Sequence, residues 1–250
     1  MTTLLAVVLG LGIGLIVGSL GGGGAILALP VLVYVLDEPV GPAATASLVV
    51  VSMAAAIGAG SLARHGHVCG RVALNFAVPA AVGSLLGTLG SRSVSGDALV
   101  LAFVPVMLLA AVLTWRGAGE DTDDGDCPRA PLSRIAVSGL GVGALTGFFG
   151  VGGGFVIVPV LTLWLDVPFR RAVGTSLVII TITGCAALAS HLIAGSRPDL
   201  GVTLTLGLAT GAGALLGTQL GERLPQALLR RGFALLVGAI ALALLIDTLT

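Results

Sequence analysis

The sequence predicts an all-α protein that crosses a membrane several times. We expect two inverted homologous repeats, each a broken re-entrant segment followed by three transmembrane helices. Composition, the spacing of charges and an internal repeat lead to this prediction. Hydrophobic residues make up 56% of the 250 residues and charged residues only 10%, against about 25% in an ordinary soluble domain. So few charges cannot cover a water-facing surface, which all but excludes a soluble globular enzyme. The net charge of zero offers no basic field for nucleic acid.

Uncharged stretches mark the segments that can cross a bilayer, because a charged side chain at the bilayer centre costs about 2.5–3.5 kcal/mol. One helical crossing needs about 17–25 residues. The stretches that approach or reach this length are 39–63, 72–91, 98–115, 172–196, 200–221 and 232–246. The last of these is short, and residues 224–229 can extend it as an interfacial turn. We expect an ordinary transmembrane helix at each.

Two further uncharged stretches, 1–36 and 135–165, are too long for one straight crossing. As helices they would measure roughly 54 Å and 46 Å, whereas the hydrocarbon layer is about 30 Å thick. A glycine cluster interrupts each of them, at 21–24 and at 150–154, and consecutive glycines break helices. Each long stretch is therefore either a bent single crossing or a re-entrant pair of short helices.

The chain contains an internal duplication. When the sequence is shifted by 129 residues, 13 of the 31 positions from 18 to 48 match those from 147 to 177. The matches include glycines, prolines, an aspartate and a serine, which hydrophobicity alone would not align. A second match appears at a shift of 130, where 83–88 falls on 213–218.

This duplication divides the chain into a first repeat at 1–115, a linker at 116–134 and a second repeat at 135–250. The linker is acidic, and we expect it to be a flexible, solvated spacer.

The arginines distinguish the two forms of the long stretches. Single crossings would make the halves parallel and divide the arginines six to six between the two sides. Re-entrant segments would make the halves inverted, with only Arg92 and Arg197 on one side. The other side would then hold Arg64, Arg71, Arg116, Arg129, Arg134, Arg170, Arg171, Arg223, Arg230 and Arg231. Because short arginine-rich loops stay in the cytoplasm, we expect inverted halves, a cytoplasmic linker and both termini on the periplasmic side.

Inverted repeats with discontinuous helices are typical of secondary transporters, whose sites lie where the broken segments meet. Half-helices at 25–36 and 155–165 would present free N–H groups and a positive dipole end at each break, and such ends bind anions. The predicted substrate-binding residues at the breaks are Ser19, Gly21, Gly22, Gly23, Gly24, Gly150, Gly152, Gly153 and Gly154. The alternative is that these glycines only let helices pack closely.

Hydroxyl groups near the start of the following helices could also donate hydrogen bonds to an anion. They belong to Thr45, Ser47, Thr175 and Ser176. The alternative for each is a hydrogen bond to a carbonyl of its own helix.

Proton coupling has few candidates, because no Asp or Glu lies inside a predicted crossing. Asp37 and Asp166 stand two residues before a proline, where a turn or cap also explains an aspartate. His191 could titrate near neutral pH or serve as a structural hydrogen-bonding residue. His65 and His67 are expected in a cytoplasmic loop without ligand geometry.

No catalytic, metal or cofactor motif is present in the sequence. Cys69, Cys127 and Cys185 lie far apart without a CxxC pair, so we expect neither a disulfide framework nor a zinc site. There is no GxxxxGK[ST] nucleotide motif and no Ser/His/Asp, Cys/His or HExxH constellation. We therefore expect no enzymatic activity and no cofactor.

The stretch GSLGGGGAILALPVLVYVLDEPVGPAATASLVVV at 18–51 resembles the signature of the TauE/SafE sulfite-exporter family. The second copy, GFFGVGGGFVIVPVLTLWLDVPFRRAVGTSLVII at 147–180, resembles it too. The resemblance implies a bacterial inner-membrane protein with two homologous halves that moves sulfite, sulfoacetate or related organosulfonates. The residues that carry the motif are Gly21, Gly22, Gly23, Gly24, Pro30 and Ser47, and then Gly150, Gly152, Gly153, Gly154, Pro159 and Ser176.

The leading hypothesis is a secondary carrier of a small sulfur-containing anion, surrounded by the lipid bilayer. A proton is a second candidate partner, and the sequence leaves open whether the chain forms a homo-oligomer. The alternatives are a non-transporting membrane scaffold or assembly protein and a channel-like anion pore.

Overall fold

The computed structural model describes residues 2–22, 27–28, 31–36, 38–91, 96–116, 126–149, 154–193 and 199–249, and its secondary structure there is entirely helical. The first half contains α1 (Thr2–Leu20), the π-helix η1 (Val31–Val35), α3 (Val40–Arg64), α4 (Gly70–Ser91) and α5 (Gly96–Arg116). The second half contains α6 (Leu132–Phe149), α7 (Gly154–Leu163), α8 (Phe169–Ile193), α9 (Leu200–Arg223) and α10 (Gln226–Leu249). The all-α prediction is confirmed for these residues.

The helices follow the uncharged stretches of the sequence. Among the described residues, α3, α4, α8 and α9 are long and apolar enough to cross a membrane. Asp199 begins α9, where its carboxylate accepts a hydrogen bond from the N–H of Val202 at 3.0 Å and so satisfies an amide of the first turn. The half-helix expected at 155–165 is present as α7. Of the half-helix expected at 25–36, the described part contains η1 and the helical residues 27–28.

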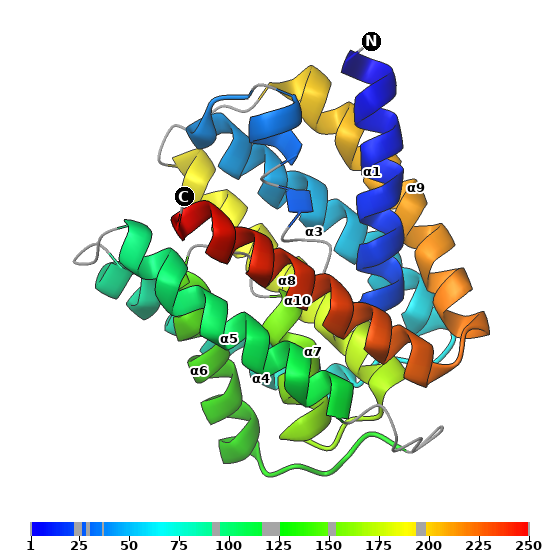
Figure 1. Ribbon diagram of the computed structural model, residues 1–250. Helices are drawn as coiled ribbons and strands as arrows, with labels where there is room; N and C mark the ends of the chain where they lie inside the picture. The colour runs from blue at the N-terminus through cyan, green and yellow to red at the C-terminus, as the bar shows by residue number, and fades with distance from the viewer. Residues whose placement is uncertain are drawn as a thin grey trace.

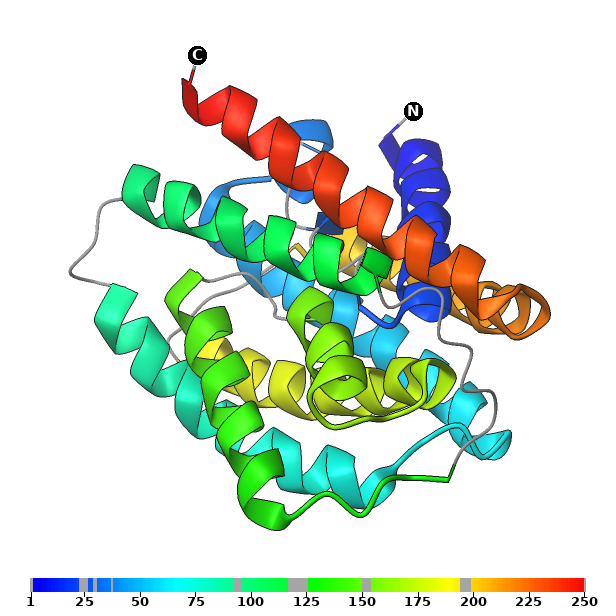
Figure 2. The same cartoon turned by 60° about the horizontal axis from the view of Figure 1, so that its bottom comes forward.

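The helices pack in pairs, and Figure 1 shows α1 lying along α9. The other close pairs are α4 with α6, α3 with α8, and α5 with α10. In the views of Figures 1 and 2, α5 and α10 run side by side across one face.

Glycines bring two of these helix pairs into backbone contact. A Cβ at Gly14 of α1 would overlap the backbone of Thr210 in α9, and a Cβ at Gly143 of α6 would overlap that of Ala80 in α4. The further contacts, in chain order, are Gly10 with Leu206, Gly18 with Ala214, Gly139 with Phe76 and Gly147 with Ser84. In each pair, residues later in one helix contact residues later in the other. α1 therefore runs parallel to α9, and α6 runs parallel to α4.

The direction of α3 follows from its contacts with two neighbours. Gly207 and Gly211 of α9 face Met53 and Ile57 of α3, so α3 also runs parallel to α9 and therefore to α1. Against α8, in contrast, α3 runs antiparallel, because Gly184 faces Ser52 whereas Gly58 faces Leu177. α1 and α3 thus start at the same end of the bundle.

Large apolar side chains lie both inside and outside the bundle. Phe76, Phe169 and Phe233 are fully buried. Leu228, Leu235 and Leu242 of α10 are seven residues apart, share one face, and are each more than half exposed. Such a stripe is unfavourable in water and suits a lipid-facing helix.

Candidate functional site

α1 ends at the first glycine cluster. Gly21 (φ 73°) and Gly22 (φ 111°) adopt positive φ values, which glycine tolerates and other residues rarely adopt. The N–H of Gly21 donates to the carbonyl of Val17 at 2.9 Å, as in a helix closed by a left-handed glycine. The amide of Gly21 is therefore engaged by its own helix, and its carbonyl is directed elsewhere.

The two glycine breaks lie against each other. A Cβ on Gly22 would be 3.0 Å from the Cα of Gly154, and a Cβ on Gly154 would be 2.8 Å from the carbonyl oxygen of Gly22. The side chain of Ile180 packs on both glycines. Since α7 starts at Gly154, its first-turn N–H groups, which have no partner within the helix, begin at this contact.

Ser176 of α8 joins the second half of the chain to the first break. It is fully buried, and its Oγ lies 2.7 Å from the carbonyl oxygen of Gly21 and 2.8 Å from that of Val173. Its neighbour Thr175 is also fully buried, and accepts a hydrogen bond from the N–H of Cys69 at 3.0 Å. Both hydroxyls are thus part of contacts between segments far apart in the sequence.

The remaining predicted hydroxyls differ from these two. Ser19 donates to Leu15 at 2.7 Å and Ser47 donates to Ala44 at 2.8 Å, each within its own helix. Thr45 is fully buried in α3. The predicted residues Gly23, Gly24, Asp37, Gly150, Gly152 and Gly153 and the side chain of His191 lie outside the described part of the structure.

Asp166 lies at the end of α7, in a turn with a positive φ of 54°. Its Oδ2 is 3.7 Å from Nη1 of Arg134, and its side chain is 73% exposed. The Arg134 guanidinium also lies 5.5 Å from the centre of the Trp164 ring. Because Arg134 belongs to the start of α6, this exposed ion pair places the end of α7 beside the start of α6.

A small cavity, partly open to the surface, lies next to the first break. Gly18 and Ser19 of α1 line it, together with Val173, whose Cα is 2.8 Å from the position of a Cβ on Gly21. The polar and charged side chains that line it are those of Ser19, His67, Arg170, Thr218 and Glu222.

Sequence reasoning missed this cluster of charged residues. The sequence predicts His67 in a loop without ligand geometry and indicates nothing about Arg170 beyond its charge. In the structure, Oε1 of Glu222 lies 3.7 Å from Nδ1 of His67 and 3.2 Å from Nδ1 of His65. The available sequence signal was the position of Glu222 at the end of an uncharged stretch.

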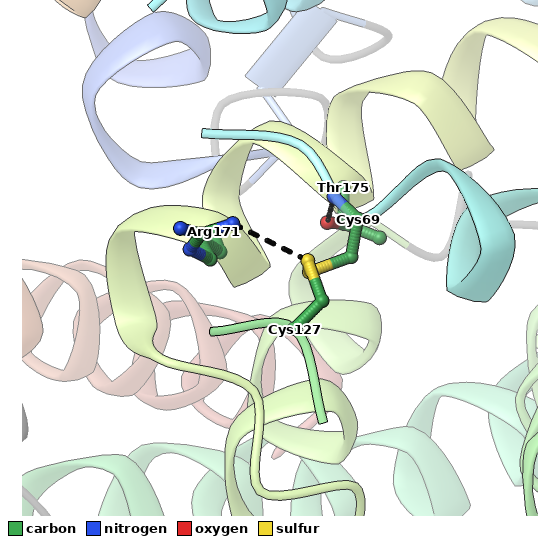
Figure 3. The surroundings of a disulfide bond; sticks show 4 residues. All are labelled: Cys69, Cys127, Arg171 and Thr175. Atoms are coloured by element: carbon green, nitrogen blue, oxygen red, sulfur yellow. Dashed lines mark hydrogen bonds between the residues drawn. A yellow bond between two sulfur atoms is a disulfide. The ribbon is translucent and has the colours of Figure 1, made fainter. Parts of the chain in front are cut away.

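Cys69 and Cys127 form a disulfide bond, shown in Figure 3. The prediction that the cysteines make no disulfide is therefore wrong for this pair. The two residues are 58 positions apart, and spacing along the chain carried no signal for a contact that the fold creates. Nη1 of Arg171 donates to Sγ of Cys127 at 3.4 Å. The end of the linker, expected to be a free spacer, is thus tied to the start of α4.

The model of the sulfite exporter TauE/SafE family matches residues 6–244. The chain belongs to the TauE/SafE sulfite exporter family. This confirms the resemblance carried by the two motif copies. No solved structure gives a significant match.

Several relatives of this TauE/SafE protein are named as transporters. A probable membrane transporter protein of Xylella fastidiosa (strain Temecula1) is 35% identical over 247 residues, covering 92% of this chain and 90% of the relative. The probable membrane transporter protein YdhB of Bacillus subtilis is 25% identical over 236 residues, with coverages of 93% and 96%. One from Methanocaldococcus jannaschii is 25% identical over 227 residues, with coverages of 86% and 84%. The TauE/SafE protein is therefore a multi-pass protein of a membrane transporter family.

Proposed function

We propose that this TauE/SafE protein is a secondary transporter that moves a small sulfur-containing anion across the bacterial inner membrane by alternating access. Sulfite, sulfoacetate and related organosulfonates are the candidate substrates, a choice supported by the family name. Backbone amides and hydroxyls at the two glycine breaks hold the anion. The contact between Gly22 and Gly154 is the observation that carries the proposal, because it joins two helix ends from different halves of the chain.

Matching contacts in the two halves support an inverted-repeat architecture. α1 corresponds to α6 at the shift of 129, and α4 corresponds to α9 at the shift of 130. The contact of Gly14 with Thr210 then corresponds to that of Gly143 with Ala80, and both contacts are present. The corresponding helices α3 and α8 run antiparallel, as inverted repeats require. Such repeats can rock against each other around a central site.

Two further observations support a re-entrant first segment in each half. In the first half, α1 and α3 start at the same end of the bundle, so the chain must return between them. In the second half, the ion pair of Asp166 with Arg134 joins the end of α7 to the start of α6. These returns leave the arginine-rich loops on one side, which supports a cytoplasmic linker and periplasmic termini.

The chemistry of the breaks suits an oxyanion. The first-turn amides of α7 offer donors and the positive end of the helix dipole, and the glycines let a substrate approach the backbone. In the first half, the amide of Gly21 is engaged with Val17. We assign the second donor to Ser176, whose hydroxyl moves from the carbonyl of Gly21 to a substrate oxygen when the anion binds.

Flux measurements on purified, full-length protein in proteoliposomes test this function. Labelled sulfite, sulfoacetate and taurine are supplied outside, with and without a trapped anion inside. We expect saturable flux that a trapped counter-anion stimulates. Gly154→Ala should abolish it, because the new methyl group would meet the carbonyl of Gly22 at the contact of the breaks. Gly141→Ala, which meets nothing within 4 Å, is the matched control.

The alternatives give different results in the same preparation. A channel-like pore would produce ohmic current without counter-anion stimulation. A scaffold protein would remain folded and show no flux of any of these solutes. Either result would overturn the carrier proposal.

A further inference from the structure

The cavity beside the first break contains polar atoms that are buried without a hydrogen-bond partner. Among the described residues, Nδ1 of His67, Nε of Arg170 and Oε1 of Glu222 are buried and make no hydrogen bond. The contact between His67 and Glu222 is 3.7 Å, which is an ion-pair distance and too long for a hydrogen bond. Nδ1 of His65 lies 3.2 Å from the same carboxylate oxygen, but its hydrogen bond is with the carbonyl of Ser61 at 2.9 Å. Buried polar groups normally have partners, so three such atoms lining one cavity point to a polar occupant.

Arg170 is the arginine that lines this cavity. Its guanidinium donates to the carbonyl of Leu224 at 3.3 Å, and none of the ion pairs found among the described residues includes it. Arginine binds oxyanions with paired N–H groups. A sulfonate or sulfite group, with its negatively charged oxygens, has the chemistry that this guanidinium recognises.

Charged and titratable groups line the cavity from three elements: His67 from the turn between α3 and α4, Arg170 from α8 and Glu222 from α9. Of the neighbouring groups, His65 lies 3.2 Å from Glu222, and Arg171 donates to Cys127 instead. Arg230 is buried and stacks 5.2 Å from the centre of the Phe169 ring, which lines the cavity. Among the lining residues Glu222 has the one carboxylate, and its Oε1 lies within ion-pair distance of both imidazoles.

We propose that this cavity binds one anion together with one proton, the anion on Arg170 and the proton on the His67–Glu222 pair. The inference rests on the proposed anion transport and names the coupling group of that site. With a neutral imidazole, the carboxylate of Glu222 repels an entering anion. When the pair takes a proton from water, an N–H or O–H bond forms, the negative charge is neutralised, and the anion can bind. Loss of that proton expels the anion.

The position of the cavity makes this pair a coupling site. Ser19 and Val173 line it, and both lie beside Gly21, where the proposed carrier holds its substrate. An anion bound in the cavity would therefore lie beside both the pair and the glycine break. Transport would then carry one proton with each anion.

Binding of isethionate to purified, full-length protein in detergent tests this proposal. Its sulfonate stays ionised between about pH 6 and pH 8, where an imidazole changes charge, so any pH dependence comes from the protein. The affinity for isethionate is measured by thermal shift. We expect it to weaken by up to about tenfold per pH unit as the pH rises, because tenfold per unit is the limit for one linked proton. An indicator dye in weak buffer should report about one proton taken up per anion bound.

Variants separate the two groups. Glu222→Gln should bind isethionate without proton uptake and with a pH dependence below about twofold, because the titrating charge is gone. His67→Gln should also reduce the pH dependence of isethionate binding. Arg170→Gln should weaken binding by about tenfold or more at every pH, and Arg170→Lys, which keeps the charge, should restore part of it. Glu38→Gln, a carboxylate substitution at the opposite end of α3, is the control.

The outcomes distinguish this inference from the proposed function. If isethionate flux shows no pH dependence and no proton uptake, the carrier proposal is unaffected. The proposal that His67 and Glu222 couple a proton to the anion is then overturned. Binding that keeps its full pH dependence in Glu222→Gln would also overturn it, as would the absence of binding at any pH. If flux fails but Glu222-dependent, proton-linked binding persists, the carrier proposal is wrong and the cavity assignment stands.

Discussion

The hydroxyl of Ser176 links α8 to the end of α1. Its bond to the carbonyl of Gly21 spans 155 positions of the sequence. Ser47 occupies the same position in the first repeat, yet its hydroxyl bonds to Ala44 in its own helix. Two residues that a repeat makes equivalent therefore have unequal effects on the folded protein, since only one of the two bonds connects the halves.

We expect Ser176→Ala to destabilise the protein by about 1–3 kcal/mol, because the buried carbonyl of Gly21 loses this donor. Ser47→Ala is the matched control and should change stability by less than about 0.5 kcal/mol, since its bond is local to one helix. Thermal denaturation in detergent micelles measures both. Equal losses in the two variants would mean that the bond between the halves contributes nothing.

At the scale of elements, the glycines of α1 and α6 set how closely these helices approach α9 and α4. Small residues four positions apart let membrane helices bring their backbones together. Gly14 and Gly143 face backbone, whereas Gly12 and Gly141, two positions earlier, meet nothing within 4 Å. The same face of each helix is therefore used in the two halves.

This arrangement predicts a paired result for alanine substitutions. Gly14→Ala and Gly143→Ala should each destabilise the protein by about 1–3 kcal/mol, because a methyl group directed at backbone cannot be relieved by a side-chain rotation. Gly12→Ala and Gly141→Ala should be neutral or slightly stabilising, since alanine favours helix over glycine. Unfolding in mixed micelles compares all four variants. A loss in one half without a loss in the other would count against equivalent packing.

At the scale of the whole molecule, two features disagree about membrane orientation. The arginine count favours a cytoplasmic linker. The disulfide of Cys69 with Cys127 joins that linker to α4, and disulfides persist mainly in oxidising compartments such as the periplasm. We propose the arginine-based orientation, because ten of the twelve arginines support it. The disulfide would then form only once the protein leaves the reducing cytoplasm.

This orientation predicts that the Cys69–Cys127 pair is kept reduced in growing cells and forms its disulfide only after exposure to an oxidising medium. After acid quenching and denaturation, the Cys185→Ser variant should take up two maleimide–polyethylene glycol labels without prior reduction. If the arginine-rich side faces the periplasm, the same variant should take up none until it is reduced, and our orientation would be reversed. A reduced sample, which takes two labels in either case, is the control.

Much of the architecture could be predicted from local properties of the chain. Long runs without charge predicted the helices, because the cost of burying a charge acts at each position separately. The end of α1 at Gly21 follows in the same way from the conformational freedom of glycine. The family could be predicted from the two motif copies, because each copy is contiguous in sequence.

The candidate site is predicted less completely. The glycine segments were singled out, but their direct contact at Gly22 and Gly154 depends on how the halves pack. The cavity lined by Arg170, His67 and Glu222 was not predicted, because these residues come from three different parts of the chain. None of them forms a recognisable motif with its neighbours in the sequence.

Sequence alone thus established a helical membrane protein of the TauE/SafE family with glycine-interrupted segments, since hydrophobicity, helix breaking and motif matches are local. The folded chain established which groups meet: Ser176 with Gly21, Cys69 with Cys127, and Glu222 with two histidines. Such contacts join residues that lie between 58 and 155 positions apart or slightly more. They result from the packing of whole helices, a property that no short stretch of sequence contains.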